Sequence, residues 1–129
     1  MAINWLVLLC VALGGATGSV ARFLLANWVN QLYGTLFPWG TFAVNFLGCI
    51  LFGIIVAGLT RWFAHDYLKW LLLIGFLGGF TTFSTFAYET VSLLQAQRIG
   101  YALLNIGLST GLCLLGLWLG LKVTNRIFL

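Results

Sequence analysis

Residues 75–86 of this 129-residue chain read GFLGGFTTFSTF. They lie in the middle of an apolar segment that is otherwise long enough to cross a membrane as one helix. The glycines lower helix propensity, and the hydroxyl side chains after them offer the backbone competing hydrogen bonds. In lipid no water meets the carbonyl and amide groups that a break sets free. A break at membrane depth therefore indicates a cavity, an ion or another protein surface beside it.

The composition decides the class of protein. Hydrophobic residues make up 62% of the chain and charged residues only 6%, with a mean hydropathy of +1.08. No soluble domain of this length could keep such a surface in water. We therefore expect an all-α integral membrane protein with a single domain over residues 1–129. The expected spans are residues 3–29, 39–59, 67–94 with a break near residues 75–82, and 101–123.

The net charge of +4 is carried by residues that flank the apolar segments, where they anchor and orient helices. We therefore expect membrane lipid around the protein and no nucleic acid as a partner. One end of the expected bundle carries four basic residues and the other at most two; they are Arg61, Lys69, Lys122 and Arg126 against Arg98 and Arg22. This weak bias favours a cytoplasmic N-terminus. It also allows both orientations to insert, which would give an antiparallel dimer.

The first span contains the small-residue pair Gly14 and Gly18, a spacing that lets another helix approach closely. Arg22 follows one turn later. Because a charge in hydrocarbon costs about 2.5 kcal/mol or more, its side chain must reach water or a partner. Two interpretations stay open. Arg22 either extends to the membrane surface or lies in an aqueous mouth, where it raises the local anion concentration.

The polar residues inside the spans are neutral and can donate hydrogen bonds. They are Asn45, Thr81, Thr82, Ser84, Thr85, Asn105, Ser109 and Thr110. No aspartate and no carboxylate cluster accompanies them, as a divalent-metal site would require. With the positive ring edges of Phe83 and Phe86, this set fits an anion pathway. Carbonyl groups freed near Gly78 and Thr81 would also suit one structural monovalent cation.

Other reactive residues carry less weight. Glu89 is the only carboxylate in a span, and it is either a proton relay or, as we favour, solvated near the membrane surface. The cysteines Cys10, Cys49 and Cys113 show no metal-binding spacing and are interpreted as small buried hydrophobes. His65 and Asp66 share a loop with no serine or cysteine nucleophile placed to use them, so we expect no enzyme.

Over essentially its full length the chain resembles the Fluc (CrcB) fluoride channels of microbial membranes. The matching pieces are GGATGSVAR at residues 14–22, GTFAVNFLG at 40–48, GFLGGFTTFSTF at 75–86, and the polar fourth segment at 105–109. The resemblance implies a multi-pass protein of the bacterial inner (plasma) membrane. It implies an antiparallel, dual-topology homodimer with two pores, which exports cytoplasmic fluoride passively and lowers fluoride toxicity.

The resemblance also implies roles for single residues. The ring edges of Phe83 and Phe86 would face fluoride, and Arg22 would lie in the vestibule. A structural sodium ion at the dimer centre would take carbonyl oxygens from Gly78 and Thr81. The other pore residues implied are Asn45, Ser84, Thr85, Ser109 and Asn105, of which Asn105 stands where some members carry a tyrosine.

A proton-coupled exporter is the competing class. The small multidrug transporters are four-span, dual-topology proteins of similar length, and they rely on a glutamate embedded in the first span. The first acidic residue here is Asp66, in a loop, which argues against that class. A purely structural membrane subunit would leave the clustered hydrogen-bond donors unexplained.

Overall fold

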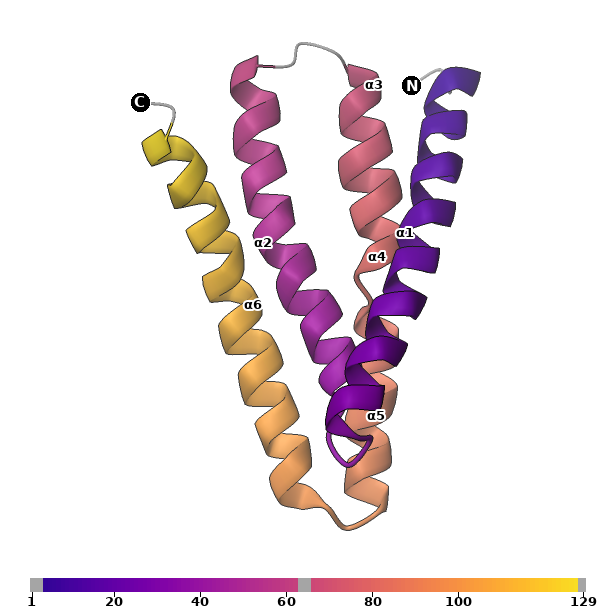
Figure 1. The fold of residues 1–129 in the computed structure, drawn as a ribbon, viewed down its shortest axis with the longest axis vertical. Coiled ribbons are helices and arrows are strands. Elements are labelled where there is room, and N and C mark those ends of the chain that lie inside the picture. The colour runs from indigo at the N-terminus through magenta and orange to yellow at the C-terminus, as the bar shows by residue number, and fades with distance from the viewer. Residues whose placement is uncertain (1–3, 63–65, 128–129) are drawn as a thin grey trace.

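The computed structural model describes residues 4–62 and 66–127. Its elements are α1 (Trp5–Tyr33), α2 (Trp39–Trp62), α3 (Asp66–Lys69), the π-helical segment η1 (Trp70–Leu77), α4 (Gly78–Phe80), α5 (Phe83–Gln95) and α6 (Ile99–Ile127). Both termini lie at one end of the molecule, and the α5–α6 connection lies at the other end (Figure 1). This arrangement suits a chain that crosses a membrane an even number of times.

Within residues 4–62 and 66–127, four helical stretches are long and apolar enough to cross a membrane: Trp5–Tyr33, Trp39–Leu59, Tyr67–Gln95 and Ile99–Arg126. Large apolar side chains stand on their outer faces, including Phe23 and Leu114, which are 67% and 65% exposed. Such a surface is stable against lipid and not against water. The prediction of an all-helical membrane protein with four spans is confirmed.

The third span is interrupted at Thr81 and Thr82 alone. Their backbones are extended, with ψ of 155° at Thr81 and φ, ψ of −148°, 116° at Thr82. The expected break was wider, near residues 75–82, but Gly75 lies in η1 and Gly78 begins α4, so both remain helical. The glycines are thus not where this helix opens.

The glycines of the third span instead pack against those of α1. A Cβ atom added to Gly75 would lie 2.9 Å from the Gly14 Cα, and one added to Gly79 would lie 2.6 Å from the Gly15 carbonyl oxygen. A Cβ on Gly18 would meet the Phe80 amide nitrogen at 3.0 Å. The backbones of α1, η1 and α4 are therefore in direct contact. This confirms that the small-residue face of the first span is buried in protein, and it identifies the covering element.

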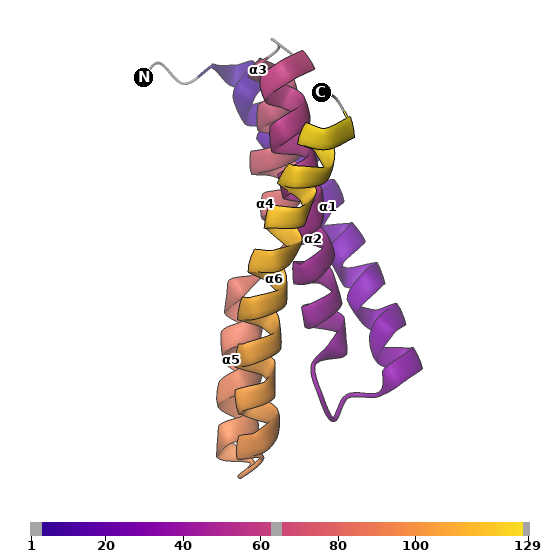
Figure 2. The ribbon, with the colours of Figure 1, turned by 90° about the vertical axis from the view of Figure 1, so that its left-hand side faces the viewer.

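A second glycine contact joins α2 to α6, which run side by side in both views (Figures 1 and 2). A Cβ on Gly120 would lie 3.2 Å from the Gly53 Cα, and one on Gly116 would lie 3.1 Å from the Phe46 ring. The apolar cluster of Val44, Leu77 and Phe80 connects this helix pair to the first one. By contrast, a Cβ on Gly107 or Gly111 would meet nothing within 4 Å.

We expect Gly18→Ala to lower the free energy of unfolding by about 1–3 kcal/mol, because its methyl group has to displace backbone of η1 and α4. Gly58→Ala is the matched control. Nothing lies within 4 Å of its Cβ position, and alanine favours helix by up to about 1 kcal/mol. Unfolding by SDS in mixed micelles, followed by circular dichroism, measures both. Equal losses in the two variants would contradict the close packing of α1.

Candidate functional site

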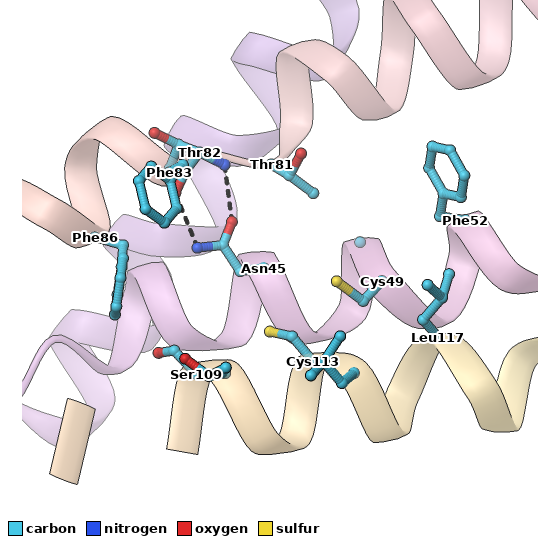
Figure 3. A pocket seen from close by; sticks show the side chains of 13 residues that line it. Asn45, Cys49, Phe52, Thr81, Thr82, Phe83, Phe86, Ser109, Cys113 and Leu117 are labelled. Carbon is cyan, nitrogen blue, oxygen red and sulfur yellow. Dashed lines mark hydrogen bonds between the residues drawn. The ribbon is translucent and has the colours of Figure 1, made fainter. Parts of the chain in front are cut away.

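The interruption at Thr82 is held by Asn45 on α2. The Asn45 Nδ2 group donates to the Thr82 carbonyl oxygen at 2.9 Å, and the Thr82 amide donates to Asn45 Oδ1 at 2.8 Å (Figure 3). One side-chain amide therefore pairs both backbone groups of a residue that has left the helix. This satisfies them at a depth where water is scarce.

Because two backbone amides at the break bond to side chains, the two carbonyl groups that they would pair with in a continuous helix are left free. In a continuous helix the Thr82 amide would pair with the Gly78 carbonyl, and the Thr85 amide with the Thr81 carbonyl. Here the Thr82 amide donates to Asn45, and the Thr85 amide donates at 3.2 Å to Thr82 Oγ1, the N-cap of α5. The carbonyl groups of Gly78 and Thr81 are thereby left available as acceptors.

On the other side of the break the chain presents donors. The first amides of α5, at Phe83 and Ser84, belong to a helix N-terminus, where backbone donors lack intrahelical partners and the helix dipole is positive. The interruption thus offers oxygen ligands in one direction and N–H donors in the other. It can accommodate a cation and an anion at separate points.

Next to the break lies a hollow of about 490 Å³ between α2, α5 and α6 (Figure 3). The rings of Phe83 and Phe86 stand at its side with centroids 5.5 Å apart, which confirms that the two rings share a face. Phe83 is 79% exposed. The hollow is lined by Asn45, Gly48, Cys49, Phe52, Thr81, Thr82, Phe83, Phe86, Ser109, Thr110, Cys113, Leu114 and Leu117.

The structure brings together only part of the expected site. Asn45, Thr81, Phe83, Phe86 and Ser109 line the hollow. Five other expected residues lie outside it: Ser84, Thr85, Asn105, Gly78 and Arg22. Of these, Ser84 and Thr85 are exposed beside the break, and their hydroxyl groups lie 3.3 and 3.0 Å from Thr82 Oγ1.

Asn105 belongs to a buried chain of hydrogen bonds and is only 1% exposed. Its Nδ2 group donates to Thr90 Oγ1 at 2.9 Å, and the Thr90 hydroxyl donates to the Phe86 carbonyl at 2.7 Å. The Ser109 hydroxyl donates to Asn105 Oδ1 at 3.2 Å. Asn105 thus orients Ser109 and, through Thr90, connects α6 to the backbone carbonyl of Phe86. The ring of Phe86 is one of the two rings beside the hollow.

Glu89 faces α2, and its carboxylate is partly buried. The prediction that this carboxylate is simply solvated is therefore wrong. Its Oε1 accepts from the Thr41 hydroxyl at 2.8 Å, and its Oε2 is buried without a hydrogen-bond partner among the described residues. Together with Asn30 and Arg98 it lines a second hollow of about 320 Å³. The single described carboxylate within the spans therefore lies outside the first hollow.

Arg22 is half-buried on α1, and within residues 4–62 and 66–127 it forms no salt bridge with Glu89. Both interpretations of its position remain predictions. His65 lies outside the described residues, whereas Asp66, which we expected in the same loop, begins the helix α3.

Sequence reasoning missed several lining residues, of which Cys49 and Cys113 are the most informative. All three cysteines are only half-buried, so the interpretation as buried hydrophobes was wrong. The signal was available in the spacing, because Cys49 lies four residues after Asn45 and Cys113 four after Ser109. Residues four apart share a helix face.

Within the described residues, four membrane-length helices, an interrupted third span and a hollow lined in part by neutral polar groups define a small polytopic membrane protein. Residues 9–121 match the family described as "CrcB-like protein, Camphor Resistance (CrcB)", and the chain belongs to this family.

Curated relatives match nearly the whole chain. It is 48% identical over 121 residues to the fluoride-specific ion channel FluC of Geobacter sulfurreducens, covering 93% of this chain and 98% of the relative. It is 48% identical over 123 residues to FluC of Acidobacterium capsulatum, covering 92% and 96%. FluC of Hydrogenovibrio crunogenus is 43% identical over 124 residues, covering 95% and 94%.

We expect Asn45→Ala to lower the free energy of unfolding by about 1–3 kcal/mol, because it leaves the amide and carbonyl of Thr82 unpaired. Asn27→Ala is the control, since the Asn27 side chain is exposed and bonds only to the carbonyl of Phe23 in its own helix. SDS unfolding gives the energies, and hydrogen exchange at the Thr82 amide shows whether the break has loosened. Unchanged exchange in Asn45→Ala would refute the role given to Asn45.

Proposed function

We propose that the protein is a fluoride-selective ion channel that exports cytoplasmic fluoride passively down its electrochemical gradient and so lowers fluoride toxicity. One observation carries the proposal: the interrupted third span, the rings of Phe83 and Phe86, and the hydroxyl groups of α6 meet at one hollow whose lining contains no acidic residue. The relatives named as fluoride-specific ion channels support the choice of anion.

The chemistry of the hollow suits a small, strongly hydrated anion. The hydroxyl group of Thr110 and the N-terminal amides of α5 can replace water as donors, and the ring edges of Phe83 and Phe86 add weak positive charge. Asn45 stabilises the break through one N–H and its carbonyl oxygen, and the second N–H of its amide stays available as a donor. Ser84 and Thr85 extend the polar path beside the N-terminus of α5, and Asn105 orients Ser109. Arg22 attracts anions to the vestibule.

The functional unit in this proposal is an antiparallel, dual-topology homodimer. Three hydroxyl-bearing residues, Ser84, Thr85 and Thr110, are exposed in the middle of spans, where lipid gives their side chains no hydrogen-bond partner. Phe83 and the open glycine pair Gly107 and Gly111 lie on the same two helices, α5 and α6. A second, inverted copy would cover these groups and close the hollow.

A structural sodium ion at the dimer centre belongs to the same proposal. The carbonyl groups of Gly78 and Thr81 have lost their helical partners, and Gly78 is exposed. Carbonyl oxygen is the ligand type that hard monovalent cations prefer. Two copies related by a two-fold axis would supply four such oxygens, and the bound ion would compensate the interrupted helices.

The protein is a multi-pass membrane protein, and its bacterial channel relatives place it in the inner membrane. Passive transport is favoured over a proton-coupled exporter because α1 contains no carboxylate. Glu89, the carboxylate described within the spans, is held by Thr41 away from the hollow.

The test is fluoride and chloride efflux from liposomes that contain the purified protein, compared with Phe83→Ile. We expect fast fluoride release with little chloride release. Phe83→Ile should slow fluoride release by about tenfold or more, equivalent to about 1.4 kcal/mol, because it removes a ring edge and keeps apolar bulk. Phe23→Ile, on the outer face of α1, should leave the rate unchanged. Release only under a proton gradient would establish a coupled exporter, and no release from a folded dimer would refute the channel.

Replacement of sodium by a large organic cation should lower the midpoint of thermal unfolding of the dimer by several degrees, because a ligand bound only to the folded state stabilises it. Circular dichroism in detergent measures the shift, and addition of sodium should reverse it. A midpoint that does not depend on sodium would remove the ion from the proposal.

A further inference from the structure

Two thiol groups meet inside the hollow. Cys49 on α2 and Cys113 on α6 both line the same part of the hollow, and Figure 3 shows their two sulfur atoms near each other. Both line the hollow of about 490 Å³, and both are free, half-buried cysteines. Cys10, on α1, does not line it.

The pair is fixed by two packed helices. Gly53 and Gly120 bring the backbones of α2 and α6 together on one side of the thiols, and Gly116 packs against Phe46 and Ile50. Loops do not contribute to the position of either sulfur atom. The two sulfur ligands are therefore preorganised, which lowers the entropy that a bound ion has to overcome.

The surroundings decide which ion such a site can take. On one side of the thiols the lining residues Phe52, Leu114 and Leu117 are apolar, and on the other side the lining carries the neutral hydroxyl groups of Ser109 and Thr110. No group of three or more His, Cys, Asp or Glu residues that could hold a metal occurs in the described part of the chain, so a closed tetrahedral zinc site is not formed there. Two sulfur ligands alone suit a soft monovalent cation in linear coordination.

We infer that Cys49 and Cys113 form a binding site for a soft monovalent metal cation of the Cu⁺ and Ag⁺ class, and that a bound cation obstructs the hollow. Two metal–sulfur bonds form as two S–H bonds break, both protons pass to water, and no oxidation state changes. The cation and two thiolates together carry one net negative charge. That charge and the lost space both oppose passage of an anion.

Binding is tested without any transport measurement. The reference is the full-length Cys10→Ser protein, reduced, freed of reductant and kept in chloride-free buffer, and the probe is Ag⁺ in equilibrium dialysis. We expect one tightly bound Ag⁺ per chain. Adding Cys49→Ser or Cys113→Ser should weaken binding by about tenfold or more, because one sulfur ligand is lost. Circular dichroism confirms that each variant is folded. Equal affinity in the reference and in either serine variant would overturn the site.

The inference that a bound cation obstructs the hollow rests on the proposed function, and it is tested by a separate measurement. Ag⁺ should block fluoride efflux from liposomes that contain wild type or Cys10→Ser, in chloride-free solution where silver fluoride stays soluble. The Cys49→Ser and Cys113→Ser variants should need about tenfold more Ag⁺ or more for the same block. Full efflux with the site saturated would overturn obstruction. Bound Ag⁺ in a protein that never releases fluoride would leave the site standing and refute the channel.

Discussion

The pair of hydrogen bonds between Asn45 and Thr82 is the constraint on which the site depends. A helix that opens within a membrane must find partners for the backbone groups it frees, because lipid supplies none. Asn45 provides a donor and an acceptor from one rigid amide, so Thr82 can leave the helix with both of its groups satisfied. The carbonyl groups of Gly78 and Thr81 and the first amides of α5 then become available to ions.

Backbone contacts between helices hold the break at a fixed position beside the hollow. Gly14, Gly18 and Gly75 allow α1 to lie directly against η1, and Gly53 and Gly120 do the same for α2 and α6. Two tightly packed pairs result, joined by a small apolar cluster that includes Val44 and Phe80. Because protein interiors resist small displacements, this packing limits how far Asn45 can move from Thr82.

The hollow is electrostatically suited to an anion because no carboxylate is among its lining residues. Glu89 points toward Thr41 and a separate hollow with Arg98. The first hollow retains neutral donors, ring edges and two thiols. An anion there meets hydrogen-bond donors and no opposing carboxylate, whereas a soft cation meets the sulfur atoms of Cys49 and Cys113.

The sequence by itself determined the class of protein, because hydropathy is a sum over neighbouring residues and needs no tertiary information. Helical spacing also sufficed to place Phe83 beside Phe86 and to identify the small-residue face of Gly14 and Gly18. Contacts between segments far apart in the chain were beyond such local rules. Only the tertiary structure showed that the break is confined to Thr81 and Thr82, since the neighbouring glycines pack against α1 and stay helical.

Tertiary structure alone also decided the partners of the polar residues. It paired Asn105 with Thr90 outside the hollow and brought Cys49 near Cys113 in the lining of the hollow. These pairs depend on the rotation and height of one helix against another. Backbone packing at remote glycines sets both, and neither quantity can be read from a spacing within one helix.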